Sequence, residues 1–404
     1  MWHDSCSNAG GPSPERMKID SSRDSPGGPP RIRFVCRILW PGGVQRILAH
    51  EAEGLQSRGF DVDLVFLRRS RKLTPFSFTS LHRTLREAED HGSLLTKVFE
   101  LLTRHYLAPR GPDATVDVDL ILSLELTRQT QDLTIYTDQF AAMFAPLGRL
   151  LRRKPYIVQI QESGFKEGGL LRRVVERVAY SRAAVLIATT PRVRATLERV
   201  GYREVCGIWP GAEIPSEIAP FESRSDDAVS VTMWDAGRHP ETFLDIAARL
   251  RAGRIVLAGS WADPDFLNAF RRRVESEGLC SRLIVTGPVT ERRLRELYST
   301  AKVGIRFGYA EEGPGMGSLE ALSHGLPLIV NAEIGIADLL KDQQRRLIVD
   351  EKDSSAVAAL IESIFHSPAL WRDLSGLSIE TVRPLEWNAH NSQLETQIRR
   401  ALMR

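Results

Sequence analysis

Two glutamates, Glu312 and Glu320, stand on either side of a glycine-rich bend in the stretch "YAEEGPGMGSLEALSHGLPLIVN". A carboxylate has two oxygens that accept hydrogen bonds from neighbouring hydroxyl groups. Glu312 follows the strand-like run "KVGIRF", and Glu320 falls in the first turn of the helix predicted for "SLEALSHG". Two glutamates eight positions apart also occur by chance, and an acid at a helix start has a purely structural interpretation. Their place between two strand-like runs favours a ligand that carries hydroxyl groups.

The bend between the two glutamates lets a ligand approach the backbone. Gly313, Gly315 and Gly317 have no side chain that would hold a ligand away. We expect Ser318 to be the N-cap of the following helix and Gly325 to end it. Free N–H groups at a helix start, together with the helix dipole, favour an anion such as phosphate. A diphosphate with hydroxyl groups at both ends describes a nucleotide sugar, which is the ligand that we predict.

Size and composition limit the function classes. A chain of 404 residues, 42% of them hydrophobic, has enough apolar material for two domains. A net charge of +3 gives no concentrated basic field, so we expect no nucleic-acid partner. The nine histidines lack H-x-x-x-H and H-E-x-x-H spacings, and no metal site is predicted. Pro-Gly-Gly after the first strand, in place of G-x-G-x-x-G, counts against a nicotinamide cofactor.

The sequence also bears on location. Residues 1–30 are rich in Pro, Gly and Ser without a continuous apolar run, which predicts a disordered tail and neither signal peptide nor anchor. The cysteines are far apart, which favours reduced thiols and a cytoplasmic protein; they are Cys6, Cys36, Cys206 and Cys280. No stretch offers the ~20 apolar residues of a membrane span, so any membrane contact would be peripheral, at the inner face.

From Arg31 onward, short apolar runs alternate with amphipathic helical stretches, which predicts parallel sheets covered on both faces. The predicted strands of the first domain, 31–215, are "IRFVCRIL", "DVDLVFL", "VDLILSL", "LTIYTD", "PYIVQIQ" and "AVLIATT". The stretch "WPGAEIPSEIAPFESRSDDAVS" breaks the rhythm as a linker, and "VSVTMW" restarts it in a second domain, 216–375. Residues 376–404 are predicted to form a crossing helix. Ligands of such α/β folds sit at the carboxyl ends of the strands, here in a cleft between domains.

The glycine-rich stretch resembles the E-x7-E signature of retaining glycosyltransferases with the GT-B fold, in glycosyltransferase family four. The family pattern E-G-F-G-x-x-x-L-E-A-M-A-x-G-x-P-V-I stands here as "EGPGMGSLEALSHGLPLI". "WPGGVQRILAHEAEGLQSRGFDVDLV" is similar to the family's opening segment, and "LIVTGPVTERRLRELYSTAKVGI" to its nucleotide side. The resemblance runs from about Arg31 to the C-terminus. It implies two Rossmann-like domains facing a central cleft, the first for the acceptor and the second for the nucleotide sugar, with C-terminal helices closing back toward the first.

The resemblance implies roles for the matching residues. Glu312 and Arg238 would be catalytic: Glu312 would accept hydroxyls of the donor sugar, and Arg238 in "WDAGRHPE" would bind phosphate. Glu320 would hold the ribose. The remaining donor-binding residues would be Gly315, Met316, Gly317 and Ser318 at the diphosphate, Val289 beside the base, and Gly42 and Gly43 in a loop that closes over the phosphates.

The match departs from the family in three places. The family commonly has a lysine a few residues after Arg238, and its absence leaves neutralisation to Arg238, helix N–H groups and Arg306. Pro314 replaces the phenylalanine of Gly-Phe-Gly and stiffens the loop. Where the first domain often has a histidine that faces the acceptor, the chain has Gln161 and Glu162 as acceptor-side candidates. These changes leave the acceptor open.

The implied activity is transfer of a sugar from a nucleoside diphosphate sugar to a hydroxyl acceptor, a glycan or lipid-linked glycan, with retention of configuration and no metal or other cofactor. The leaving phosphate can take the acceptor's proton, so no general base is named. Two alternatives stay open: a binding protein that keeps nucleotide affinity without transfer, favoured by the missing lysine, and a nucleotide-sugar epimerase of GT-B architecture.

Two further patterns have a weaker connection to function. Asp61 with Asp63, and Asp117 with Asp119, form D-x-D pairs, but each is predicted to open a strand at the edge away from the cleft. In "LGRLLRRKPY", leucines interleave with cations, as on an interfacial amphipathic segment or an ordinary solvated helix face. A lipid-linked acceptor would fit the interfacial interpretation.

Overall fold

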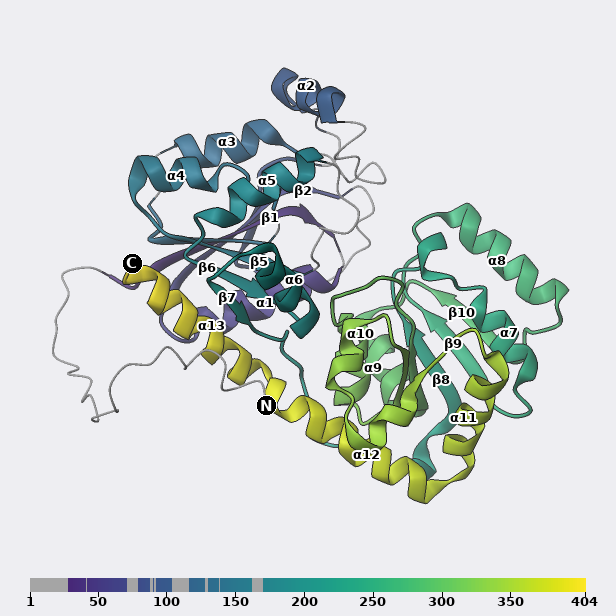
Figure 1. Ribbon diagram of the computed structural model, residues 1–404. Coiled ribbons are helices and arrows are strands. Elements are labelled where there is room, and N and C mark those ends of the chain that lie inside the picture. The colour runs from purple at the N-terminus through teal and green to yellow at the C-terminus, as the bar shows by residue number, and fades with distance from the viewer. Residues whose placement is uncertain are drawn as a thin grey trace, which may run out of the picture.

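The computed structural model describes residues 28–40, 42–70, 79–87, 90, 92–103, 116–127, 130–137, 139–161 and 170–404. They form two α/β domains, each built on one parallel sheet (Figure 1). Most of the tail predicted for residues 1–30 lies outside the described residues, and so does the acceptor-side candidate Glu162.

The described part of the first sheet has the strand order β3-β2-β1-β4-β5-β6-β7. Its strands are β1 Arg31–Leu39, β2 Asp61–Arg69, β3 His82–Thr84, β4 Leu133–Tyr136, β5 Tyr156–Ile160, β6 Val185–Ala188 and β7 Val205–Gly207. Its helices are α1 Gly43–Gln56, α2 Leu94–Thr103, α3 Val118–Leu126, α4 Ala145–Arg152, α5 Leu170–Ser181 and α6 Pro191–Val200. Most positions of β1, β2 and β4 to β6 are buried, because helices cover both faces of the sheet.

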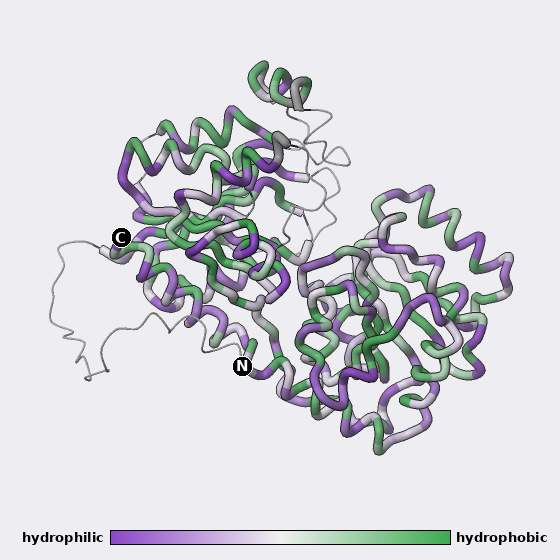
Figure 2. Tube along the Cα trace, viewed as in Figure 1, coloured by the Kyte–Doolittle hydropathy of each residue, from purple (hydrophilic) through white to green (hydrophobic). Residues whose placement is uncertain are grey.

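The second sheet has the order β10-β9-β8-β11-β12-β13. Its strands are β8 Ser225–Val231, β9 Arg254–Ala258, β10 Leu283–Gly287, β11 Ala301–Arg306, β12 Leu328–Asn331 and β13 Ile348–Val349. Its helices are α7 Thr242–Arg249, α8 Pro264–Ser276, α9 Glu291–Thr300, α10 Met316–Ser323, α11 Ser354–His366 and α12 Pro368–Val382. The short helices are η3 Phe221–Ser223, η4 Ala236–Arg238, η5 Gly335–Leu339, η6 Asp342–Leu347 and η7 Arg383–Leu385. Figure 2 shows apolar residues gathered along the central strands of each domain.

The last helix, α13 Trp387–Leu402, returns to the first domain, as the fold prediction required (Figure 1). Its apolar residues Leu394, Ile398 and Ala401 join the same buried cluster as Leu48 and Leu55 of α1. Helices α1 and α13 therefore cover one face of the first sheet, while α3 to α6 contribute to the cluster on the other face. The chain thus crosses between the domains twice.

Two sequence predictions were wrong. "VDLILSL" forms helix α3 and no strand, so only the first D-x-D pair opens a strand. The strands β3 and β4 are parallel members of one sheet, so the chain must cross over a face of the sheet between them. Helix α3 lies in this connection. The linker prediction extended too far, because β8 already begins at Ser225.

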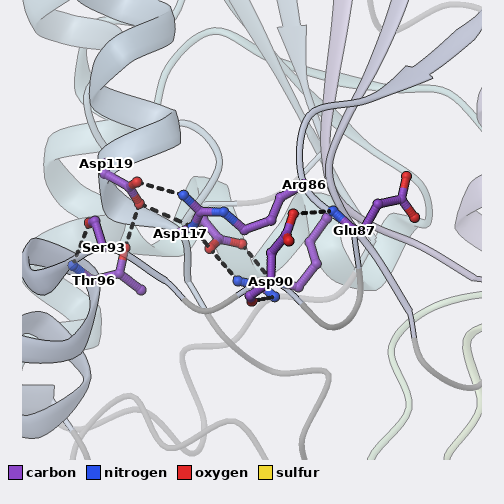
Figure 3. A network of polar contacts seen from close by, with 8 residues as sticks. Arg86, Glu87, Asp90, Ser93, Thr96, Asp117 and Asp119 are labelled. Carbon is purple, nitrogen blue, oxygen red and sulfur yellow. Dashed lines mark hydrogen bonds and ion pairs between the residues drawn. The ribbon is translucent and has the colours of Figure 1, made fainter.

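The second D-x-D pair belongs to a network of ion pairs that ties α3 to the end of β2 (Figure 3). Asp117 is almost fully buried and accepts from Arg68 at 2.9 and 2.7 Å and also from Arg86. Asp119 accepts from Arg86 at 2.7 Å and from the Thr96 hydroxyl of α2 at 2.6 Å. These aspartates therefore link α3 to the end of β2 and to α2.

Candidate active site

Each sheet has a point where the strand order reverses, between β1 and β4 and between β8 and β11. In open α/β sheets, ligands bind at the carboxyl ends of the strands at such a point. In the second domain the loop after β8 leads to Arg238, and the loop after β11 carries Glu311 and Glu312. In the first domain Gly42 and Gly43 follow β1. The topology therefore brings three of the predicted regions to the expected edges.

The helix after the glycine-rich loop begins two residues earlier than we predicted. Gly315, with φ +65°, is the N-cap and α10 starts at Met316, so the prediction of Ser318 as the cap was wrong. A left-handed φ is strained for residues other than glycine, which explains Gly315 at this position. Ser318 lies in the first turn, fully buried, with an Oγ that has no hydrogen-bond partner among the described residues. An unpaired hydroxyl at a helix N-terminus suits an anion.

Gly317 serves packing. A Cβ on Gly317 would lie 2.7 Å from the carbonyl oxygen of Val231, at the end of β8. This glycine therefore lets the first turn of α10 pack against β8.

Two arginines meet at one carboxylate beside this helix start. Arg306, at the end of β11, donates from Nη2 to both oxygens of Glu311, at 3.0 and 2.7 Å. Arg238 donates to Oε2 of the same carboxylate. The Arg306 Nε lies 3.5 Å from where a Cβ of Gly315 would be, so this guanidinium stands at the N-terminal end of α10. The two cations, the helix N-terminus and the Ser318 hydroxyl together suit a diphosphate.

Glu312 turns toward the first domain. Its carbonyl oxygen accepts from the Thr190 hydroxyl at 2.7 Å, and its carboxylate accepts from the Thr196 hydroxyl at 3.4 Å. Thr190 is the N-cap of α6, and Thr196 lies in the middle of the same helix. A buried carboxylate at the boundary between the domains is placed to meet a sugar that lies between them.

Glu320 also reaches across to the first domain. Its carboxylate pairs with Arg46 of α1 at 2.5 Å and accepts from the Tyr298 hydroxyl at 3.2 Å. Burial raises the pKa of Glu320, although the positive charge of Arg46 acts in the opposite direction. The Glu320 charge in turn raises the pKa of Arg46, and burial raises that of Tyr298 well above its ordinary value. The acid predicted to hold a ribose is thus paired with a cation of the other domain.

Gly43 of the first loop lies against the second domain, whereas a Cβ on Gly42 would meet Trp40 and Gln45 of its own domain. A Cβ on Gly43 would lie 2.8 Å from the Cγ of Met316, so this loop and the start of α10 are in contact. Gly42 is the N-cap of α1 in extended backbone. A side chain at position 43 would therefore force the Met316 side chain to move.

The other predicted residues lie farther from these contacts. Val289, between β10 and α9, is partly buried against the core of the second domain. Gln161 follows β5, and its carbonyl oxygen accepts from the Thr189 hydroxyl at 3.2 Å. It stands at the carboxyl edge of the first sheet, the side on which an acceptor candidate belongs.

Sequence reasoning missed Glu311, Arg46, Thr190 and Tyr298. Glu311 directly precedes the signature, and Arg46 falls one turn after Gly43 on a helix that was predicted. Their positions in the sequence could therefore have identified Glu311 and Arg46 as site residues. Thr190 and Tyr298 act through contacts between segments distant in the chain, for which their local sequence contains no signal.

Within the described ranges, no three histidine, cysteine or acidic side chains gather as they would around a metal ion. Among the helices of the described residues, none combines the length and apolar character that crossing a membrane requires.

Comparison with protein families matches both domains. Residues 42–206 match the model of the "Glycosyl transferase 4-like domain", and residues 227–376 match "Glycosyl transferases group 1". EpsD of Bacillus subtilis (strain 168), a glycosyltransferase by name, is 25% identical over 214 residues, or 48% of this chain and 55% of EpsD. That match spans about half the length of the relative.

Solved structures share the fold. HepE of Anabaena, in complex with UDP and glucose, has a TM-score of 0.70 at 14% identity and covers 91% of this chain and 99% of its own. Sucrose-phosphate synthase of Thermosynechococcus elongatus has 0.73 at 20%, over 93% and 99% of the two chains. The pneumococcal O-GlcNAc transferase GtfA, with UDP and GlcNAc, has 0.69 at 13%, over 93% and 99%. The two family matches together take in more than half of the sequence, and the chain therefore belongs to the group 1, GT4-like glycosyltransferases with the GT-B fold.

Proposed function

We propose that this protein transfers a sugar from a nucleoside diphosphate sugar to a hydroxyl acceptor, with retention of configuration and without a metal ion. The observation that carries the proposal is the gathering of Arg238 and Arg306 at the N-terminus of α10, next to the unpaired Ser318 hydroxyl. Two guanidinium groups and a helix N-terminus replace the charge that a metal ion would supply to a diphosphate. The UDP complexes of HepE and GtfA favour a uridine diphosphate sugar as donor.

In this proposal each residue acts by binding and orienting. Arg238, Arg306 and the N–H groups of α10 stabilise the charge that grows on the departing diphosphate. Glu312 accepts hydrogen bonds from hydroxyls of the transferred sugar, and Glu320 accepts those of the ribose. The departing phosphate oxygen takes the proton of the acceptor hydroxyl, on the same face of the sugar. Closure of the domains excludes water from the donor and holds the acceptor near the reacting carbon.

The first test is the turnover of purified Arg238→Ala and Glu312→Ala with a UDP-sugar and a hydroxyl acceptor. Loss of one donor that stabilises the leaving group costs about 2.7–4 kcal/mol of barrier, or roughly 100- to 1000-fold in kcat. We expect Arg238→Ala to fall in that range and Glu312→Ala to lose at least as much. Arg372→Ala, on an exposed arginine paired with Glu222, is the matched control. Wild-type turnover in either site variant would remove that residue's role.

The same assay separates the alternatives. A transferase consumes donor only when the acceptor is present, an epimerase converts donor alone, and a binding protein consumes none. Because the donor is unidentified, a thermal-shift screen over nucleotide sugars comes first. A ligand at 100 times its Kd stabilises the fold by about 2.7 kcal/mol.

We further propose that the acceptor is linked to lipid and that helices α4 and α5 contact the membrane. Helices α3, α4 and α5 contact one another in sequence on one face of the first domain. Leu150 and Leu151 of α4, and Val174 and Val178 of α5, are exposed there. The acidic residue described on α4 and α5, Glu176, is buried, while Arg153, Arg173 and Arg177 are exposed. Exposed apolar side chains among cations fit an anionic lipid surface.

Sedimentation with vesicles tests this contact. We expect the wild-type protein to bind vesicles that contain phosphatidylglycerol and not those of phosphatidylcholine alone. The double variant Arg153→Glu, Arg173→Glu should lose this binding, while Arg272→Glu, an exposed site on α8 of the second domain, should keep it. Unchanged partitioning of the double variant would remove the proposal.

A further inference from the structure

Glu311 is an acid that the glycosyltransferase signature does not include. Its side chain is only 8% exposed, and both of its carboxylate oxygens are engaged by Arg306. Oε2 accepts from Arg238 as well. One carboxylate therefore holds together the two cations assigned to the diphosphate in the proposed function.

The two arginines are held differently. Arg306 is 5% exposed and makes two contacts with the carboxylate, a geometry that fixes both groups. Arg238 lies in the short helix η4, has 26% of its side chain exposed and reaches one oxygen. Arg238 has the more exposed side chain of the two arginines and makes a single contact with the carboxylate, so it is the cation that can exchange partners.

The backbone around Glu311 is fastened. Its carbonyl oxygen accepts from the N–H of Gly335 at 2.9 Å. The Asn331 side chain bonds to both the N–H and the carbonyl oxygen of Gly308, at 3.0 and 2.7 Å. The Glu311 carboxylate is therefore unable to follow Arg238 if that side chain swings toward a ligand.

The place where a ligand would attract Arg238 lies next to its ion pair with Glu311. Arg306 stands at the N-terminal end of α10, and the unpaired Ser318 hydroxyl lies in the first turn of the same helix. A diphosphate bound there would carry more negative charge than one carboxylate. It would compete with Glu311 for Arg238 and leave the buried Arg306 pair in place.

We propose that Glu311 is an internal counter-ion that occupies Arg238 until the diphosphate of the donor displaces it. The inference rests on the proposed function and adds a positioning residue to it. Before the donor binds, Glu311 orders Arg238 and neutralises its charge. The ion pair forms again when the diphosphate product leaves. Its charge therefore weakens the binding of the diphosphate and speeds its release.

Isothermal titration calorimetry with UDP and with inorganic pyrophosphate tests the competition. Pyrophosphate carries the phosphates without a base, so its binding isolates this part of the site. Removal of the carboxylate that competes for Arg238 should lower the Kd of Glu311→Gln for both ligands roughly two- to fivefold. In turnover, KM for the donor should fall and kcat should fall with it, because product leaves more slowly. A purely structural role would raise the Kd.

Two further variants sharpen the test. In an Arg238→Ala background the substitution Glu311→Gln should no longer tighten binding, since no cation remains to be released. Glu333→Gln, on a nearby exposed glutamate that accepts from the N–H of Ala310 at 2.9 Å, is the matched control and should bind as the wild type does. If Glu311→Gln fails to fold, Glu311→Asp takes its place in the test. Its shorter side chain still pairs with Arg306 but does not reach Arg238, so this variant should also bind both ligands more tightly than the wild type.

The outcomes separate the two proposals. A wild-type protein that binds neither UDP nor pyrophosphate overturns the proposed function and this inference together. A wild-type protein that binds both, loses affinity on Arg238→Ala and gains none in folded Glu311→Gln or Glu311→Asp overturns the role of Glu311 alone.

Discussion

At the scale of single residues, the site contains two acids whose partners come from elsewhere in the chain. Glu320 meets Arg46 of the first domain, and Glu311 meets Arg238 from the neighbouring loop. Glu311 is buried and Glu320 is partly buried, and each pairs with a cation that is more exposed than itself. In the proposed function, donor groups therefore replace contacts that these two acids already make.

The Arg46–Glu320 pair predicts a change in pH dependence. Burial raises the pKa of Glu320 and Arg46 lowers it, so Arg46→Ala should raise that pKa further. The proposed ribose contact needs the carboxylate as an acceptor. We therefore expect the acid limb of the kcat/KM profile to move to higher pH in Arg46→Ala, whereas Arg46→Lys keeps the positive charge and should keep the limb in place. Identical pH profiles of kcat/KM for the wild type and Arg46→Ala would contradict a role of Glu320 in donor binding.

The sequence indicated the site residues whose identity follows a local pattern. Glu312, Glu320 and Arg238, the arginine proposed to bind phosphate, were named from a local motif and from the family resemblance that it carries. Glu311 was not, although it adjoins the signature, because its importance arises from a contact with Arg306 at the end of β11 and with Arg238 from a separate loop. The prediction of Ser318 as the N-cap was wrong, since a cap depends on backbone dihedral angles that one turn of sequence does not determine.

At the scale of elements, the segment after β2 is where pattern reading failed. "VDLILSL" is almost entirely apolar, so its periodicity does not distinguish a buried strand from a buried helix. The distinction comes from the partners of Asp117, which Arg68 and Arg86 engage at the start of α3 (Figure 3). By contrast, α1, α5, α6 and α13 each have a polar face, so their sequences carry a helical period that a strand would not have.

The network at α3 predicts acid-sensitive stability. Burial raises the pKa of Asp119, but hydrogen bonds from Arg86 and Thr96 outweigh it and lower the pKa from 3.8 to about 2. A depressed pKa stabilises the fold above pH 4 and loses that contribution as the pH falls toward 2. The difference in unfolding free energy between wild type and Asp119→Asn should therefore be constant from pH 5 to 7 and shrink by about 2 kcal/mol below pH 4.

Thermal unfolding over pH 2–7 measures this difference. Asp245→Asn, at an exposed aspartate of α7, is the matched control and should show a pH-independent difference. If the Asp119→Asn difference also stayed constant down to pH 2, the network would contribute nothing through this carboxylate.

At the scale of the whole molecule, α1 and α6 of the first domain contact the second domain, and two crossings join the domains. Arg192 of α6 pairs with Asp338 of η5 at 2.7 Å and donates to the carbonyl oxygen of Ala332 at 2.8 Å. Gly43 meets Met316 at the other contact. These contacts lie on the edges that would close on a donor, so the arrangement described here is one in which the facing edges already meet.

A buried polar cluster attaches α13, the helix that follows the second crossing, to the first domain. His390 of α13 donates from Nδ1 to the carbonyl oxygen of Trp209 at 2.7 Å, and its Nε2 lies 2.9 Å from a carboxylate oxygen of Glu51. Gln159 of β5 donates to both oxygens of that carboxylate, at 2.8 and 2.9 Å. Glu51 is 1% exposed, so His390→Ala leaves a buried carboxylate with one partner fewer.

We expect His390→Ala to lower the stability of the first domain by about 2–3 kcal/mol, because a lost hydrogen bond to a buried charge costs that much. Hydrogen exchange measured by mass spectrometry locates the effect. Protection should fall in peptides of α1, β5 and α13 and stay unchanged in β8 to β12, since α13 packs in the core of the first domain. His366→Ala, at an exposed histidine of α11, should leave both patterns intact. Equal loss of protection in both domains would mean that α13 stabilises the molecule as one cooperative unit, with no preference for the domain it covers.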